Sequence, residues 1–172
     1  MRTSFILILL TSFMISSQAQ ISISGMNGIK INQTKTEVEK LLGNKLELKP
    51  DANGYNYFTE IIKDGVPLRL SFVKYDDEKE GSVYELYSIS TESDKIKTLS
   101  GIGTGNSLED LWNTYKDNYN ISLYFYYDED QEQIDKGKRA FVLSGINEDT
   151  IIYFYLKANK IYRIVVGLDE GC

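Results

Sequence analysis

Side chains that commonly carry catalysis are scarce in this chain of 172 residues. It has no histidine, and its one cysteine, Cys172, is the last residue. Ser–His–Asp triads, Cys–His pairs and His-ligated metal sites are therefore excluded. A Ser–Lys dyad or a pair of carboxylates stays open in principle. Because the acids in the repeated motif described below have a structural role, the chain is predicted to be non-enzymatic, with no cofactor and no metal ion.

Three glycines in the run Gly101-Ile-Gly-Thr-Gly-Asn-Ser107 invite comparison with a phosphate-binding loop. A dinucleotide-binding loop needs glycine where Asn106 stands, and a Walker loop needs a Gly-Lys pair that this run lacks. The spacing instead favours a tight turn that leads into a helix capped by Ser107. No nucleotide is expected here.

An acidic run, Asp128–Glu132, places acids at positions 1, 3 and 5 of a possible calcium loop. Position 6 of that loop is Gln133 rather than glycine, and position 12 is Arg139 rather than glutamate. The pattern therefore favours a solvated acidic loop over Asp128–Lys138.

Tyrosine is the functional side chain that this sequence supplies in excess, with thirteen copies. Strand alternation places two of them on one face of a strand over Ile121–Tyr127 and two on one face of a strand over Thr150–Lys157. A two-residue turn at Ala158-Asn159 would bring the strand Lys160–Gly167 beside the strand Thr150–Lys157. The tyrosine of the former strand is then expected opposite the tyrosines of the latter. The five candidate contact residues are Tyr124, Tyr126, Tyr153, Tyr155 and Tyr162, with Tyr155 expected opposite Tyr162.

A sheet face that carries several tyrosines has two interpretations. Tyrosine is amphipathic and loses little rotamer entropy on binding, so it is enriched where proteins bind proteins. The same rings could be ordinary cross-strand aromatic pairs on a solvated face. Both interpretations stay open at this point, as does the choice of the face that the helices cover, because both faces of these strands are fairly apolar.

The elements that must position this face show an internal repeat. The stretches Gly28–Leu42 and Gly101–Tyr115 align without a gap, 73 residues apart. Each carries an N-cap residue with an acid three positions later, which predicts a capping box. These pairs are Thr34 with Glu37, and Ser107 with Asp110. Helices are predicted over Lys35–Leu42, ended by Gly43, and over about Leu108–Asp117.

Period-two alternation after each helix predicts antiparallel strands. The predicted strands are Ile21–Met26, Tyr55–Ile62, Pro67–Tyr75, Val83–Thr91, Ile121–Tyr127, Ala140–Ser144, Thr150–Lys157 and Lys160–Gly167. The strand ends 83–86 and 161–164 also match, with an offset of 78. The expected fold class is α+β: two tandem helix–β-meander repeats, about residues 24–92 and 97–168, that form one antiparallel sheet with two short helices on one face.

The first nineteen residues have the pattern of a secretory signal peptide. Arg2 supplies the positive charge, the apolar run starts at Phe5, and Ser17-Gln-Ala19 is a cleavage site. Cleavage after Ala19 would leave one domain, residues 20–172, without a transmembrane segment, in the periplasm or secreted. It would carry 18 basic and 25 acidic residues, a net charge of −7, which disfavours nucleic acid as a partner. Cys172 is then either free or paired with another chain.

Two helix–meander repeats, each opened by Gly-Ile-x-x-x-x-[Thr/Ser]-x-x-[Glu/Asp]-[Val/Leu], resemble the β-lactamase inhibitory protein fold. The segment Gly28–Gly43 also resembles the opening of the small outer-membrane-assembly lipoproteins. This chain lacks the disulfides of the former and the lipid-accepting cysteine of the latter. The resemblance implies an exported α+β domain whose relatives mostly bind proteins, and it assigns no role to a named residue.

The function expected from these observations is that of an exported protein-binding domain, an inhibitor or an immunity-like protein. Its partner would be another protein, bound by the tyrosine-bearing sheet face. The alternative is a structural or assembly accessory of the cell envelope, and an enzyme is the least favoured class.

Overall fold

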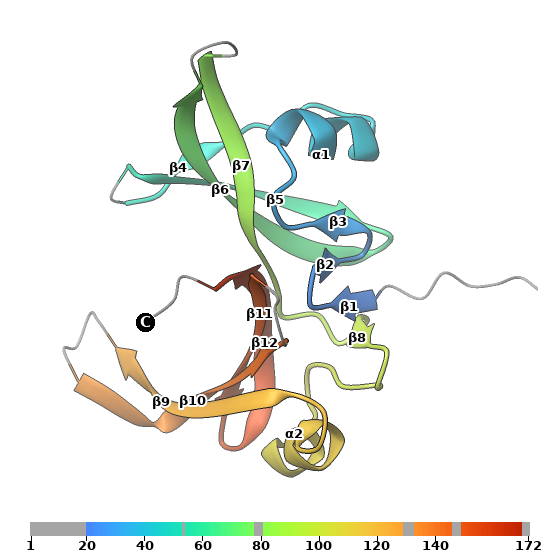
Figure 1. The fold of residues 1–172 in the computed structure, drawn as a ribbon, viewed down its shortest axis with the longest axis vertical. Coiled ribbons are helices and arrows are strands. Elements are labelled where there is room, and N and C mark those ends of the chain that lie inside the picture. Colours follow the sequence, from blue (N-terminus) through green and yellow to red (C-terminus); the bar gives the residue numbers. More distant parts are fainter. Residues whose placement is uncertain (1–19, 53, 78–80, 129–132, 146–148, 170–172) are drawn as a thin grey trace, which may run out of the picture.

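The structure is a computed structural model that describes residues 20–52, 54–77, 81–128, 133–145 and 149–169. The predicted signal peptide and Cys172 lie outside these residues. These residues form an α+β fold (Figure 1). It has two short helices, an eight-stranded antiparallel sheet and a four-stranded mixed sheet among the described residues. In the described part of the chain, no helix is long and apolar enough to cross a membrane.

The large sheet has the strand order β4-β5-β6-β7-β12-β11-β10-β9. Its strands are β4 (Lys49–Pro50), β5 (Asn56–Lys63), β6 (Val66–Asp77), β7 (Gly81–Thr91), β9 (Asn120–Asp128), β10 (Gln133–Ser144), β11 (Thr150–Lys157) and β12 (Lys160–Leu168). Two meanders therefore meet where β7 pairs with β12, through four register pairs from Ser88–Gly167 to Thr91–Ile164.

The small sheet has the order β3-β2-β1-β8 and was only partly predicted. Its strands are β1 (Gln20–Ser22), β2 (Gly25–Met26), β3 (Ile29–Lys30) and β8 (Lys97–Thr98). The prediction of one strand over Ile21–Met26 was wrong, because the chain reverses between β1 and β2 and pairs Ile21 with Met26. Strand β8 pairs in parallel with β1, across a sequence separation that no local pattern reveals.

Both predicted capping boxes are confirmed. In front of α1 (Lys35–Leu42), the Thr34 N–H donates to Glu37 Oε2 at 2.8 Å, and the Glu37 N–H donates to Thr34 Oγ1 at 3.3 Å. In front of α2 (Leu108–Tyr115), Ser107 and Asp110 make the same two bonds at 2.8 and 3.1 Å. Each box satisfies N–H groups that the first turn of a helix leaves without a partner.

The two helices end differently. Gly43 follows α1 with φ of 73°, a left-handed conformation that a residue with a side chain rarely adopts. Helix α2 ends at Tyr115, two residues before the predicted Asp117, and its C-cap Lys116 stays right-handed. The Tyr115 hydroxyl is hydrogen-bonded to the Thr98 hydroxyl at 2.8 Å, which joins the end of α2 to β8 of the small sheet.

The face of the large sheet that the helices cover is decided by the core. Val38 of α1 and Leu111 of α2 are fully buried in one cluster with Met26 and Ile29 of the small sheet. The large sheet contributes alternate residues of its strands to this cluster, among them Leu68, Leu70, Phe72, Phe141, Ile152, Phe154, Leu156 and Ile164. Figure 1 shows both helices and the small sheet on the same side of the large sheet. Tyr153 and Tyr155 point to the opposite side, where they pack on a separate small cluster.

The acidic loop is shorter than predicted. Strand β9 continues to Asp128 and β10 begins at Gln133, so the prediction of a loop over Asp128–Lys138 was wrong. Gln133, Ile134 and Asp135 pair with the end of β9 in the hairpin, and the register shifts between Asp135 and Arg139. Polar composition hid this strand, because a strand at the sheet margin needs few apolar side chains.

The loops in front of the two helices bond to the sheet in the same way. The Asn32 N–H donates to the Leu86 carbonyl at 2.8 Å, and the Leu86 N–H donates to the Gln33 carbonyl at 2.9 Å. The corresponding bonds on the other side join Gly105 and Asn106 to Ile161, at 2.8 and 2.9 Å. Leu86 and Ile161, which make these bonds, are 75 residues apart in the sequence.

A register shift follows both of these strand positions. Between β6 and β7 the partner of Ser71 is Ser88 and that of Phe72 is Leu86, so Tyr87 is the extra residue. Between β11 and β12 the extra residue is Tyr162. Each β-bulge increases the local twist of its strand.

Candidate protein-contact surface

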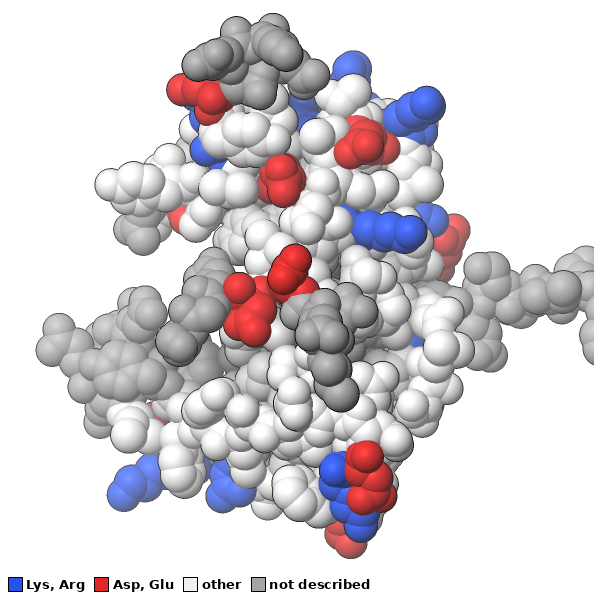
Figure 2. All heavy atoms as spheres, in the orientation of Figure 1, with Lys and Arg blue, Asp and Glu red and all other residues white. Residues whose placement is uncertain are grey.

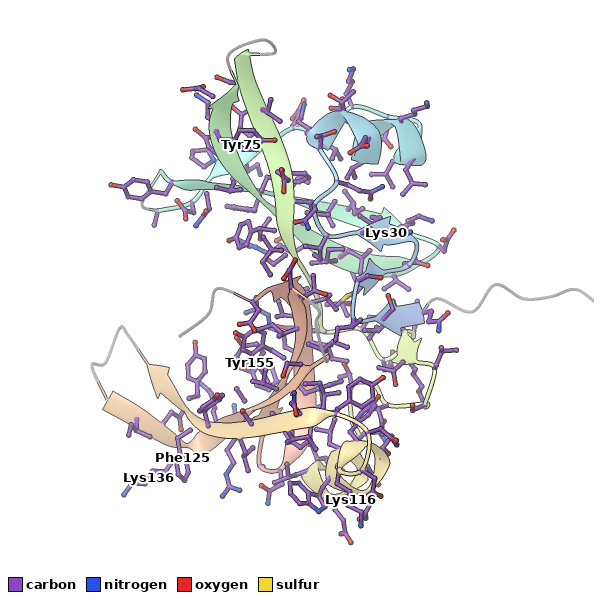
Figure 3. The ribbon with its side chains drawn as sticks, viewed as in Figure 1. Lys30, Tyr75, Lys116, Phe125, Lys136 and Tyr155 are labelled. Carbon is purple, nitrogen blue, oxygen red and sulfur yellow. The ribbon has the colours of Figure 1, made fainter. Side chains whose placement is uncertain are left out.

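All five candidate tyrosines lie in the second meander. Paired residues on adjacent strands lie on the same face of the sheet. Ser122 of β9, Val142 of β10 and Tyr153 of β11 form one such row, and Tyr124, Ala140 and Tyr155 form the next. This is the face opposite the helices. We call the set Tyr124, Tyr126, Tyr153, Tyr155 and Tyr162 the tyrosine surface. Figure 3 shows Tyr155 inside the curve formed by β9–β12, whereas Phe125 lies on the outer side of that curve.

Four of the five rings form a contact cluster centred on Tyr155. Tyr153 and Tyr155 stack with ring centroids 6.0 Å apart and planes 20° apart. Tyr126 meets Tyr155 edge to face at 6.0 Å, and Tyr162 is tilted against it at 6.4 Å. Offset-stacked and edge-to-face pairs are the favoured geometries for aromatic rings, so the cluster holds each ring in a defined orientation.

Tyr124 is separated from the ring cluster although it shares the face. In the register it is a partner of Ala140, and Ala140 is a partner of Tyr155 on the next strand. The small side chain of Ala140 lies between the two rings. The structure gives Tyr124 no ring contact among the described residues, and its side chain is 56% exposed.

The prediction that Tyr155 lies directly opposite Tyr162 was wrong. The turn at Ala158-Asn159 forms as predicted, with Lys157 paired to Lys160 and Leu156 to Ile161. The bulge at Tyr162 then shifts the ladder, so that Tyr155 is paired with Arg163. Both rings still meet, because the extra residue of the bulge remains beside Tyr155 on the same face.

Two cations that the sequence alone does not predict lie next to these rings. The Arg163 guanidinium carbon lies 5.7 Å from the centre of the Tyr155 ring, and Lys138 Nζ lies 5.2 Å from the centre of the Tyr126 ring. Cations at this distance are attracted by the negative face of the ring. The signal that could have revealed Arg163 is its position beside Tyr162 in the sequence, but its contact depends on the bulge.

Burial controls the protonation of the cluster. It raises the pKa of the Tyr155 hydroxyl above its usual range, and the positive charge of Arg163 opposes that shift. Burial also raises the pKa of Tyr162, with Lys138 in opposition. Both phenols are therefore protonated at neutral pH, and they offer hydrogen-bond donors and acceptors rather than a base or a nucleophile.

A groove of about 980 Å³ adjoins the tyrosine surface where the two meanders meet. Arg163 lines this groove and also contacts Tyr155, so the two features are continuous. Its other lining residues are Glu60, Ile61, Ile62, Pro67, Leu68, Arg69, Ser90 and Glu92. The groove has two basic and two acidic residues together with apolar ones, so its charges are balanced and it favours no simple ion.

Charge is unevenly distributed over the second meander. In the view of Figure 2, charged side chains around β9–β12 lie along the lower margin of the molecule, and a separate group of acidic side chains lies in the middle of the view. Among the residues that the structure describes, no three His, Cys, Asp or Glu side chains gather as a metal site would require. Compared with known protein families, with curated proteins and with solved structures, the chain shows no match.

Proposed function

We propose that this chain is an exported, non-enzymatic protein-binding domain, an inhibitor or immunity-like protein, whose contact site is the tyrosine surface. The observation that carries the proposal is the cluster of Tyr126, Tyr153, Tyr155 and Tyr162 on the sheet face opposite the two described helices. The partner is another protein, with no role for nucleic acid. Export with cleavage after Ala19, and the resemblance to the β-lactamase inhibitory protein fold, belong to the same proposal.

The geometry of the rings supports a binding role in energetic terms. Tyrosine and arginine are the residues that most often dominate the binding energy at protein interfaces. Rings that already hold one another in place lose little conformational freedom when a partner arrives. The alternative, a purely structural set of cross-strand pairs, predicts that truncating these rings affects stability alone.

A capture experiment separates these two possibilities. The mature chain is immobilised and exposed to an envelope extract, beside a variant with Tyr124, Tyr126, Tyr153 and Tyr155 all changed to alanine. Tyr55→Ala is the matched control, because Tyr55 is 79% exposed and lies in the first meander. Circular dichroism and thermal unfolding verify that each variant is folded.

We expect the wild type and the Tyr55→Ala control to capture the same protein and the fourfold variant to lose it. Equal capture by a folded fourfold variant would contradict the proposed contact site. Specific recovery of outer-membrane assembly proteins, in place of a soluble target, would favour the alternative of an envelope accessory protein.

We also propose that the fold consists of two tandem repeats, about residues 24–92 and 97–168. The two capping boxes, the matching hydrogen bonds of Leu86 and Ile161, and the bulges at Tyr87 and Tyr162 support it. The tyrosine surface lies within the second repeat. A contact site confined to one repeat would mean that the other copy serves mainly to complete the sheet.

A further inference from the structure

The two edges of the large sheet are built differently. Strand β4 at one edge has two residues and includes Pro50, which has no N–H to donate. Strand β9 at the other edge has nine residues, contains no proline and no basic residue, and has Asp128 at its end as its one charged residue. Proteins usually protect a sheet edge with short strands, prolines or lysines. At the first edge, β4 gives such protection to Tyr57 and Phe58 of β5, whereas no residue of β9 has it from a described strand.

The middle of β9 is apolar on both faces and open to solvent. Leu123 and Phe125, on the helix side, are 46% and 54% exposed, and Tyr124 on the other side is 56% exposed. Within the described part of the chain, no strand pairs with the outer side of β9. The unpaired N–H and C=O groups of this edge are therefore available to the strand of another chain.

A groove of about 440 Å³ continues this edge on the helix side. Leu123 and Arg139 line it from the sheet, and Leu108 and Trp112 line it from α2, with Trp112 52% exposed. The Arg139 guanidinium carbon lies 5.4 Å from the centre of the Phe125 ring. A strand added to β9 would thus find apolar contacts on the helix side for alternate side chains.

We propose that the occupant of this edge is β9 of a second copy of the chain. The two strands would pair antiparallel about a two-fold axis at Tyr124, and the two large sheets would join into one continuous sheet. Tyr124 is the midpoint of Asn120–Asp128, so this axis pairs every residue of β9. An isologous contact of this kind closes on itself and does not continue into a fibre.

The register about this axis is self-complementary. Leu123 falls opposite Phe125 of the second copy, on the helix side, beside both Trp112 grooves. Tyr124 lies opposite Tyr124 of the second copy, and Ser122 lies opposite Tyr126 of the second copy. Asp128, the one charged residue of the strand, falls opposite the neutral Asn120, so no like charges meet across the axis. Aromatic and aliphatic cross-strand pairs of this type stabilise antiparallel ladders.

The oligomeric state of the mature chain tests the proposal. Sedimentation equilibrium is measured on the wild type, on a Leu123→Lys/Phe125→Lys variant, and on the control Ile134→Lys. Ile134 is 55% exposed, like the two test residues, but it lies on β10, where it pairs with Tyr127 on the inner side of β9 and is not part of the outer edge. These substitutions leave all five residues of the tyrosine surface unchanged, so the result is independent of the proposed capture of a protein partner.

We expect the wild type and the control to have twice the mass of one chain and the double-lysine variant to have the mass of one chain. A wild type that stays monomeric throughout the micromolar range would overturn the proposal. So would a double-lysine variant that remains folded and dimeric, because the contact would then lie elsewhere.

Disulfide trapping tests the register. In a Cys172→Ser background, Tyr124→Cys would place two thiols directly opposite each other, at the Cα separation that a disulfide needs. Ser122→Cys is the matched control, since its opposite residue is Tyr126. A covalent dimer is expected from the first variant alone. Its absence from a chain that sediments as a dimer would overturn the axis at Tyr124.

Discussion

Arg163 and Tyr155 are directly paired in the ladder between β11 and β12, and the guanidinium carbon of one lies 5.7 Å from the ring centre of the other. Replacing Arg163 by methionine keeps an extended side chain and removes the charge. We expect the free energy of unfolding to fall by about 0.5–1 kcal/mol, the usual contribution of such a contact at a partly exposed site. Chemical denaturation of the wild type and the variant measures this change in the free energy of unfolding. The control Arg139→Met removes a cation from Phe125 and leaves the tyrosine surface intact.

The same pair predicts a titration. The positive charge of Arg163 lowers the pKa of Tyr155, against the larger effect of burial. Arg163 also lowers the pKa of Tyr162, again against the larger effect of burial. Arg163→Met is therefore expected to move the tyrosinate absorbance of both rings to higher pH, whereas Arg139→Met leaves the titration unchanged. An identical titration curve for wild type and Arg163→Met would contradict the contact.

Alkaline pH is expected to destabilise the fold through the buried rings. Burial raises the pKa values of Tyr115, Tyr155 and Tyr162 above the ordinary 10.0. Because the folded pKa exceeds the unfolded one, their contribution is fully present below about pH 10 and is lost as pH rises through the folded values. Thermal unfolding measured at increasing pH should show this loss. Tyr115→Phe should reduce its size, although it also removes the bond to Thr98.

Acid pH should destabilise the region around α1 through Glu39. This buried carboxylate bonds Lys35 at 2.8 Å, the Leu46 N–H at 2.8 Å and Lys45 at 3.1 Å. The bond to Lys35, followed by that to Leu46, lowers the pKa of Glu39 from 4.5 to about 2. A lowered folded pKa gives stability that is present above pH 4.5 and lost as pH falls toward 2.

Glu39→Gln should flatten this acid dependence and lower the melting temperature at neutral pH, because the glutamine cannot form the two ion pairs. Glu47→Gln is the control, since Glu47 is exposed and has no ion pair among the described residues. Equal acid profiles for the two variants would refute the role assigned to Glu39.

The turn between β11 and β12 offers a stabilising substitution. Ala158 and Asn159 have φ values of 50° and 60°, the left-handed conformation that a two-residue hairpin turn of this type requires. Alanine is poorly suited to it, whereas asparagine is enriched there. Ala158→Asn is expected to raise the free energy of unfolding by about 0.5–1 kcal/mol. Ala52→Asn tests whether asparagine stabilises irrespective of conformation.

Loss of either helix cap should have a similar effect in both halves. Thr34→Ala and Ser107→Ala each remove one member of a capping box and should each cost about 1 kcal/mol of unfolding free energy. Asn113→Ala, on the exposed side of α2, is the control and should be nearly neutral. A neutral result for both cap variants would show that tertiary packing alone holds the helices.

Structural features that depend only on residues close in the sequence could be predicted. The caps at Thr34 and Ser107, the end of α1 at Gly43, and the turn at Ala158-Asn159 all depend on contacts within a few residues. Strand alternation likewise located Thr150–Lys157 correctly. It also placed Tyr153 and Tyr155 on one face, because side-chain direction in a strand alternates whatever lies around it.

Tertiary structure decided what depends on distant partners. Strand β8 exists because β1 lies beside it, and the polar beginning of β10 is held by its pairing with β9. The bulge at Tyr162 replaced the expected Tyr155–Tyr162 pair by Tyr155–Arg163, through a register that no local pattern encodes. The sequence by itself thus determined the local elements and the alternation of the tyrosines. Long-range packing alone decided that the helices cover the Phe154 face, because only the assembled core distinguishes two sheet faces that are both apolar.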